Sequence, residues 1–212
     1  MIRTRWSAVG MLWAVVAAFS LPAFGATISW KNSRTGAVEA ARNSARLILL
    51  LAGRDTCGNC QYMKETVCES AGVRPVLQAN YVCWYCPVDY STEWYAYASG
   101  LGSFTLPLIC VVDPGDATAY LDRTTATQTV SAFSGRLGSH LPTQPIALVL
   151  VRDTVSHLAW ETESPIRYRV LRSQNLKAWS FVGGIVPGTG STVSIDDTYT
   201  APGCFYKVLG FR

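Results

Sequence analysis

A pair of cysteines placed directly behind an apolar run constrains the fold of this chain more than any other feature. Residues 47–51 are continuously apolar (Leu-Ile-Leu-Leu-Leu), which is typical of a strand buried on both faces of a sheet. Cys57-Gly58-Asn59-Cys60 follows shortly after this run. Two thiols at this spacing can form a disulfide if a helix begins at the first one, where backbone N–H groups and the helix dipole favour the thiolate. The sequence therefore predicts a buried strand, a reactive dithiol and a helix, in that order.

The first residues have the features of a signal peptide. Arg3 and Arg5 form a basic start, residues 11–21 are an apolar stretch, and Ala23-Phe24-Gly25 ends in the small-x-small pattern that signal peptidase reads. We place the signal peptide at residues 1–25, with an uncleaved N-terminal anchor as the alternative. No later segment approaches the roughly 18 apolar residues that cross a bilayer. We therefore expect a periplasmic or secreted protein that contacts a membrane only through an uncleaved anchor.

The charge of the chain argues against one class of partner. The formal net charge of +4 falls to +2 when Arg3 and Arg5 leave with the signal peptide, and no dense basic patch is visible. This charge is too small to indicate nucleic acid or an anionic surface as a partner. The sequence carries no Gly-rich nucleotide motif, and His140 and His157 form no metal or triad pattern. We therefore expect no nucleic-acid partner and no organic or metal cofactor.

Residues 26–141 alternate between strand and helix patterns. The expected strands are 27–30, 47–52, 81–88 and 106–112, and the expected helices are 37–46, 57–70, 92–99 and 127–140. We expect Ser91 or Thr92 to cap the third of these helices. This order predicts an α/β domain with helices on the faces of a sheet.

The texture of the sequence changes after a short Pro-bounded linker at residues 142–145. Residues 146–212 show no helical periodicity and instead hold short β-rich runs, separated by Gly and Pro clusters: 146–151, 157–160, 168–172, 180–182, 192–195 and 205–209. Short strands at this spacing predict a small antiparallel β-sandwich domain. We expect Trp160, Tyr168, Trp179 and Tyr206 to supply its core.

The seven cysteines leave several pairings open. They are residues 57, 60, 68, 83, 86, 110 and 204. In an oxidising compartment thiols pair, and an odd number leaves at least one unpaired within the chain. Cys57 and Cys60 fit a redox dithiol, a purely structural disulfide or, together with the second pair Cys83 and Cys86, a four-cysteine zinc site. The 22 residues between the two pairs slightly exceed the usual interval of about 15–20.

The other cysteines suggest less chemistry. Cys83 and Cys86 lie in an aromatic strand pattern, where residues three apart face opposite sides. One of them is a possible structural partner for Cys68. Cys110 is expected to be a packed thiol inside a buried strand.

Residues 26–141 resemble the thioredoxin superfamily, most of all its exported thioredoxin-like members with a Cys-x-x-Cys-x-x-Met motif. The resemblance rests on Cys57, Cys60 and Met63 behind the apolar run, and on Thr105-Leu106-Pro107 before the strand 108–112. It implies that Pro107 is cis and faces the dithiol, and that Leu106 offers backbone groups to a substrate strand. It also implies that Cys57 attacks and Cys60 resolves the mixed disulfide. Cys57, Cys60 and Pro107 are thus the predicted catalytic residues.

Two positions depart from this resemblance. Thr56 stands where a Trp commonly precedes the first cysteine, and Leu51 stands about where the best-known members keep a buried acid for proton transfer to the second cysteine. Arg54 and Asp55 place opposite charges beside the dithiol, and the sequence alone does not decide which one dominates. Residues 146–212 weakly resemble fibronectin type III-like sandwiches, on the strength of Leu158-Ala159-Trp160, residues 168–173 and residues 204–208.

These observations lead to an exported thiol–disulfide oxidoreductase that exchanges disulfides with cysteine-containing exported proteins, with a membrane electron donor as a further possible partner. The alternative from a different class is a non-catalytic surface or adhesion protein, in which a thioredoxin scaffold carries a locked Cys57–Cys60 disulfide. Leu51 and the odd number of cysteines favour this alternative, whereas the intact dithiol and Pro107 oppose it.

Overall fold

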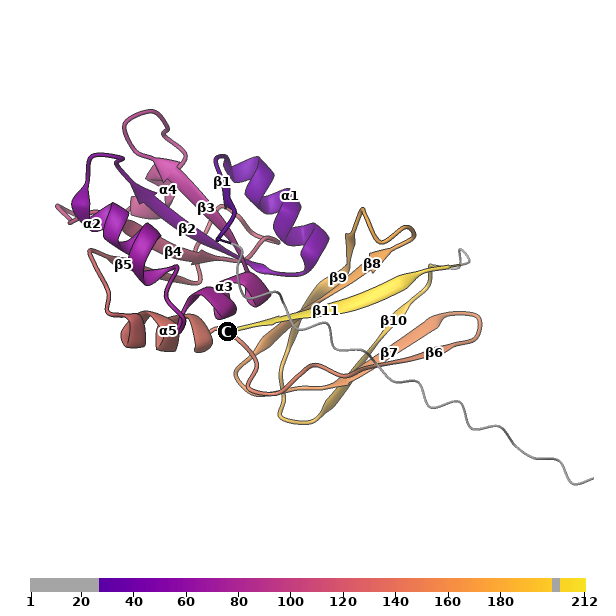
Figure 1. Cartoon of the computed structure of the whole chain (residues 1–212). Coiled ribbons are helices and arrows are strands. Elements are labelled where there is room, and N and C mark those ends of the chain that lie inside the picture. Colours follow the sequence, from indigo (N-terminus) through magenta and orange to yellow (C-terminus); the bar gives the residue numbers. More distant parts are fainter. Residues whose placement is uncertain (1–26, 200–202) are drawn as a thin grey trace, which may run out of the picture.

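The chain folds into an α/β unit followed by an all-β unit (Figure 1). The structure is a computed structural model that describes residues 27–199 and 203–212. The signal peptide expected at residues 1–25 lies outside the described residues. Within the part of the chain that is described, no helix is both long enough and apolar enough to cross a membrane.

The α/β unit is built on a five-stranded sheet in the order β1-β3-β2-β4-β5. Its central strand β2 (Leu47–Gly53) is buried at every residue, as the apolar run predicts. Strand β3 (Tyr81–Pro87) runs parallel to β2, and β1 (Trp30–Lys31) runs parallel to β3. On the other side, β4 (Leu108–Val112) is antiparallel to β2, and β5 (Asp122–Thr125) is antiparallel to β4.

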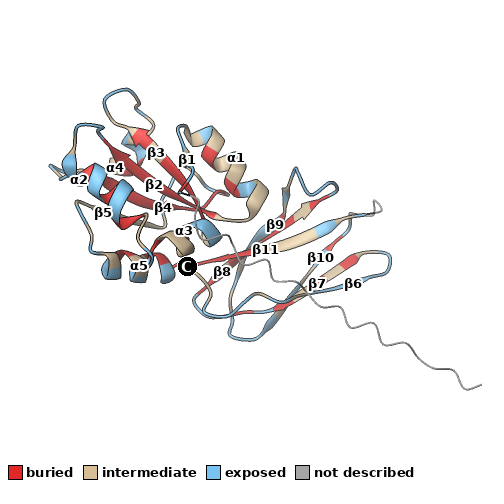
Figure 2. Ribbon diagram, viewed as in Figure 1, coloured by how far each residue is buried: buried red, intermediate tan, exposed pale blue. Residues whose placement is uncertain are grey.

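Alternating residues of the strands divide the interior into two layers of helices. One face of the sheet carries Leu47, Leu49 and Leu51 and is covered by α2 (Gly58–Gln61), the π-helical segment η1 (Tyr62–Val67), α3 (Arg74–Asn80) and α5 (Val130–Gly138). The other face carries Ile48 and Leu50 and is covered by α1 (Arg34–Ser44) and α4 (Tyr95–Ala98). In Figure 2 the strands form the buried layer between these helices.

The helix boundaries differ from the sequence-based expectation at identifiable residues. Helix α1 starts three residues before the expected position because Ser33 caps it by accepting a hydrogen bond from the Gly36 N–H. Helix α4 has only four residues and no side-chain cap, so the expected capping by Ser91 or Thr92 was wrong. Helix α3 was not predicted, although Pro75 at its start is compatible with a helix N-terminus.

The all-β unit consists of two three-stranded antiparallel sheets, as the spacing of its short runs predicts. One sheet has the order β10-β7-β6 and the other β11-β8-β9. The strands are β6 (Leu148–Arg152), β7 (Ser156–Glu161), β8 (Arg167–Ser173), β9 (Ser180–Pro187), β10 (Thr192–Asp197) and β11 (Phe205–Phe211). The two sheets form a sandwich-like unit, while its finer likeness to fibronectin type III domains stays a prediction.

The core of this unit contains only part of the aromatic set expected there. Trp160 and Tyr168 are buried in it, with their ring centroids 6.0 Å apart. Tyr206 is half-buried at the margin, where its hydroxyl donates to Asp197. Trp179 does not belong to this core: its half-buried ring packs against the buried cluster that the two units share, and the Lys207 ammonium lies 3.8 Å from its ring centroid. The placement of Trp179 in the sandwich core was therefore wrong.

The two units share a hydrophobic core. Leu171, Leu209 and Phe211 of the all-β unit belong to the same buried cluster as Phe133 and Leu137 of α5. In Figure 1, strand β11 accordingly runs toward α5 and ends beside it. The all-β unit thus completes one hydrophobic layer of the α/β unit.

Polar contacts reinforce this interface. The Arg169 guanidinium contacts the Asp113 carboxylate at 2.9 Å, with both side chains nearly buried. Lys207 donates to the Asn43 carbonyl at 2.8 Å, and the Arg212 N–H donates to the His140 carbonyl at 3.1 Å.

Candidate active site

Cys57 and Cys60 form a disulfide at the start of helix α2, as their spacing predicts. Their Cα atoms are 5.2 Å apart, within the usual range for a disulfide. Cys57 is the N-cap of the helix, and its Sγ accepts a hydrogen bond from the Cys60 N–H at 3.2 Å. When the disulfide is reduced, the same N–H donor and the helix dipole stabilise a Cys57 thiolate.

The two sulfur atoms differ in accessibility. Cys57 is half-buried, whereas only 1% of Cys60 is exposed. A partner molecule can therefore approach Cys57 but cannot reach Cys60 directly. The assignment of Cys57 as the attacking sulfur and Cys60 as the resolving one is compatible with this asymmetry and stays a prediction.

Gly53 sits directly beneath the disulfide and was not identified from the sequence. A Cβ atom built on Gly53 would lie 2.8 Å from Cys60 Sγ and 2.9 Å from Cys60 Cβ. Only a residue without a side chain allows this close approach of strand and helix. The available signal was a glycine at the end of an otherwise apolar strand.

The cis-proline expected from the sequence lies at the same end of the sheet as the disulfide. The Leu106–Pro107 peptide bond is cis, and Pro107 is buried immediately before β4. Because Ala52 pairs with Leu108 in antiparallel register, Pro107 comes next to Gly53, which contacts Cys60. The sheet thus brings together Cys57, Cys60 and Pro107.

At this end of the sheet, Leu106 has backbone groups that are not used in hydrogen bonds with the described residues. The Ala126 N–H donates to the carbonyls of both Thr105 and Pro107, at 3.0 Å each. Among residues 27–199 and 203–212, neither the N–H nor the C=O of Leu106 has a hydrogen-bond partner. These two groups are therefore available to an extended peptide backbone.

The position expected to lack an acid is fully apolar. Leu51 is completely buried and pairs with Tyr85 on β3 and Ile109 on β4. No carboxylate can therefore accept the Cys60 proton from this position.

Charged groups near the dithiol are already engaged. Arg54 donates to the Asp89 carboxylate at 2.8 Å. The Tyr85 hydroxyl donates to the Asp55 carboxylate at 2.9 Å, and the Lys64 ammonium lies 4.3 Å from the centroid of the Tyr85 ring. The role of Tyr85 was not predicted, because this contact joins residues 30 positions apart.

Four other cysteines are packed thiols. Cys68, Cys83, Cys86 and Cys110 are at most 3% exposed, and none of them is in a disulfide. Burial raises the pKa of the Cys68 and Cys110 thiols to about 12, so neither is a nucleophile near neutral pH. The expected packing of Cys110 is confirmed, whereas the possible staple from Cys68 to Cys83 or Cys86 is not formed.

The positions of Cys83 and Cys86 exclude the four-cysteine zinc alternative. Cys83 faces the layer of α2, α3 and α5, while Cys86 faces the layer of α1 and α4. The two sulfurs therefore lie on opposite faces of the sheet and cannot bind one ion with Cys57 and Cys60. Within the described residues, no group of three or more His, Cys, Asp or Glu side chains is arranged to hold a metal.

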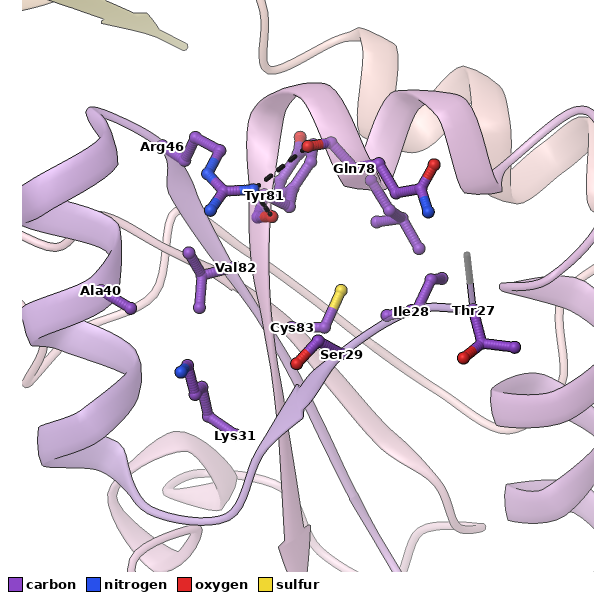
Figure 3. A pocket seen from close by; sticks show the side chains of 11 residues that line it. Thr27, Ile28, Ser29, Lys31, Ala40, Arg46, Gln78, Tyr81, Val82 and Cys83 are labelled. Carbon is purple, nitrogen blue, oxygen red and sulfur yellow. Dashed lines mark hydrogen bonds between the residues drawn. The ribbon is translucent and has the colours of Figure 1, made fainter. Parts of the chain in front are cut away.

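A cavity of about 280 Å³ lies at the opposite end of the strands from the dithiol. Figure 3 shows Cys83 among its lining residues, with Arg46 donating to the carbonyls of Gln78 and Tyr81 at 3.1 and 3.3 Å. Burial raises the pKa of Cys83 well above its usual range, so this thiol stays protonated. The cavity therefore adds no second thiol site.

A sheet of this order, a disulfide at a helix N-terminus and a neighbouring cis-proline define the α/β unit as a thioredoxin-like domain. Comparison with protein families agrees, since residues 29–114 match the family model described as thioredoxin-like. No curated protein matches the chain significantly.

Solved structures similar to this chain include three thioredoxins. A thioredoxin from Thermus thermophilus is 22% identical with a TM-score of 0.44, covering 53% of this chain and 85% of its own. A single-site mutant of a thioredoxin from Halobacterium salinarum is 18% identical with a TM-score of 0.41, covering 56% and 95%. Chloroplastic thioredoxin z is 15% identical with a TM-score of 0.37, covering 53% and 93%.

Proposed function

We propose that this protein is an exported thiol–disulfide oxidoreductase that exchanges disulfides with cysteine-containing exported proteins. The thioredoxin-like domain and its Cys57–Cys60 pair support thiol–disulfide oxidoreductase chemistry in general. One observation carries the proposal: a half-buried Cys57 at a helix N-terminus is bonded to a buried Cys60, beside the open backbone groups of Leu106.

Starting from the disulfide, the exchange runs in two balanced steps. A partner thiolate attacks Cys57 Sγ, a mixed disulfide forms, and the Cys57–Cys60 bond breaks with Cys60 leaving as a thiolate that takes up a proton. A second partner thiolate then attacks the partner's own sulfur in the mixed disulfide and releases the Cys57 thiolate. The partner is oxidised and the dithiol is reduced, and the reverse sequence reduces a partner disulfide.

The open Leu106 backbone groups supply a way to hold the partner. An extended segment that pairs with the N–H and C=O of Leu106 gains main-chain hydrogen bonds that do not depend on its sequence. Such binding suits a range of cysteine-containing chains, with a membrane protein as the source or acceptor of electrons.

The N-terminal sequence supports the proposed location. Arg3, Arg5 and the small-x-small pattern ending at Gly25 support export to the periplasm or secretion. Cell fractionation, together with N-terminal sequencing of the exported protein, tests this part of the proposal. An intact N-terminus in the cytoplasmic fraction would contradict it.

Disulfide turnover tests the activity. The full chain and the variant Cys57→Ser are compared in the reduction of insulin by dithiothreitol and in the reoxidation of a reduced model protein. We expect activity well above background for the wild type and background rates for the variant, while Cys60→Ser accumulates the mixed disulfide. Cys110→Ala removes a buried thiol from the same sheet and serves as the control that retains activity.

A second candidate function is favoured by one observation. Leu51 leaves the buried Cys60 without an acid at that position, which suits a surface or adhesion protein with a locked disulfide. Turnover by the wild type no faster than by Cys57→Ser would favour this candidate over the oxidoreductase.

A further inference from the structure

The charges around the dithiol do not cancel evenly. The loop between β2 and α2 carries Arg54 and Asp55, of opposite sign, within three residues of Cys57. Each charge on this loop affects the Cys57 thiolate, because charges closer than the Debye length of about 10 Å interact in physiological salt. The balance therefore depends on which of the two charges is already paired.

The positive charge of Arg54 is paired. Its Nε lies 2.8 Å from Asp89 Oδ1, and both side chains are about half-exposed. Seen from Cys57, this ion pair is close to neutral. Arg54 is therefore not the main influence on the dithiol.

Asp55 is held in place by neutral donors. The Tyr85 hydroxyl donates to its carboxylate at 2.9 Å, and the Gln61 side-chain amide donates to its backbone carbonyl at 2.6 Å. Tyr85 comes from β3, where it pairs with Leu51, so the loop is tied to the strand next to the one that leads to the dithiol. Burial and the Asp55 carboxylate raise the pKa of Tyr85, which keeps its hydroxyl a neutral donor.

A further positive charge, Lys64, reaches this pair only through the Tyr85 ring. Lys64 from η1 lies 4.3 Å from the Tyr85 ring centroid, and no ion pair joins it to Asp55 among the described residues. Lys64 therefore weakens the field of Asp55 without cancelling it.

We propose that Asp55, fixed in place by Tyr85, is a positioning residue that sets the acidity and the reduction potential of the dithiol. The inference rests on the proposed function and supplies an electrostatic influence that Leu51 does not. A carboxylate two residues before Cys57 disfavours the thiolate and so opposes the helix dipole. Because only the reduced form carries the thiolate, Asp55 favours the disulfide and lowers the reduction potential.

The test measures Cys57 directly and does not depend on turnover. The rate of Cys57 alkylation by iodoacetamide is followed against pH in full-length Cys60→Ser protein, with and without Asp55→Asn. The reduction potential of the intact dithiol is measured in glutathione buffers. Glu65→Gln is the matched control, because it removes one exposed carboxylate roughly 10 Å further along the helix axis.

We expect Asp55→Asn to lower the pKa of Cys57 and to raise its thiolate fraction below that pKa about threefold to tenfold. At a pH above the pKa of Cys57, where the reduced form carries the thiolate, the same factor corresponds to a rise of about 15–30 mV in the reduction potential. Tyr85→Phe is expected to shift both quantities in the same direction but less, and to add nothing in the double variant. Glu65→Gln is expected to change neither quantity.

Salt provides a second, independent readout. Raising the ionic strength from about 0.01 to about 1 M screens Asp55, so the pKa of Cys57 falls more in the Asp55-containing protein than in Asp55→Asn. Equal effects of Asp55→Asn and Glu65→Gln, or a pKa that rises in Asp55→Asn, would overturn the inference. A wild type without exchange activity that still shows the Asp55 shift would reject the proposed function alone.

Discussion

Truncation of Phe211 should destabilise both units together. Phe211 is completely buried at the end of β11, inside the cluster that also holds Phe133 and Leu137 of α5. Replacing a buried Phe by Ala removes the contacts of its ring and leaves a cavity, which costs about 3–5 kcal/mol. Because the cavity opens at the shared core, we expect the free energy of unfolding to fall by this amount for the whole molecule.

Urea unfolding measures this effect. Tryptophan fluorescence reports on both units, since Trp84 lies in the α/β core and Trp160 in the sandwich core, and far-ultraviolet circular dichroism reports on the strands and helices. At a slope of about 1–3 kcal/mol per molar urea, a loss of about 3–5 kcal/mol lowers the midpoint by roughly 1–5 M. The two probes should shift together.

Phe205 supplies the matched control. It lies on the same strand but is 43% exposed, so Phe205→Ala should cost less than about 1 kcal/mol. A Phe211→Ala protein with two separate transitions, only one of them shifted, would refute the idea that the two units share one cooperative core.

Two further outcomes follow from local geometry. Gly53→Ala places a Cβ atom against Cys60, so it should lower the free energy of unfolding by about 1–3 kcal/mol and slow disulfide exchange. Gly58→Ala, whose added Cβ meets nothing within 4 Å, should lower it less. Thermal melts and turnover rates of the two variants check this. Burial would raise the pKa of Asp122, but hydrogen bonds with Arg136 and His140 lower it. The Asp122 carboxylate therefore stabilises the folded protein above the unfolded pKa of about 4, and this stabilisation disappears as the pH falls through the folded pKa. The free energy of unfolding of Asp122→Asn should therefore be about 1 kcal/mol lower than that of the wild type at neutral pH, and it should fall less steeply as the pH is lowered. Unfolding curves of the wild type that stay unchanged as the pH is lowered would contradict this.

The sequence predicts those parts of the fold that depend on local patterns of residues. The apolar run at residues 47–51 and the Cys57–Cys60 spacing led to the central strand and the helix that follows it, and all six β-rich runs of residues 146–212 became strands. Strand β5 was missed because Asp122–Thr125 has no apolar residue and depends on pairing with β4. Trp179 was misplaced because an aromatic residue does not reveal which of two adjacent cores it joins.

The same limit applies to the site. Cys57, Cys60 and Pro107 were identified because they form short motifs, and the catalytic role of all three stays a prediction. The contacts of Gly53 with Cys60 and of Tyr85 with Asp55 depend on strand register and on how helix α2 crosses the sheet. No local pattern encodes these distances.

The two packed thiols on β3 can report on local opening of the helical layers that cover this strand. Cys83 and Cys86 share one strand but lie under different helices, the first beneath the layer of α3 and α5 and the second beneath the layer of α1 and α4. A thiol reagent reaches Cys86 only when the layer of α1 and α4 detaches, whereas Cys83, which also lines the cavity of Figure 3, is reached when this cavity widens or the layer of α3 and α5 detaches. Mass spectrometry of the two labelled sites can therefore tell which side of the sheet opens first, and no additional cysteine has to be introduced by mutation.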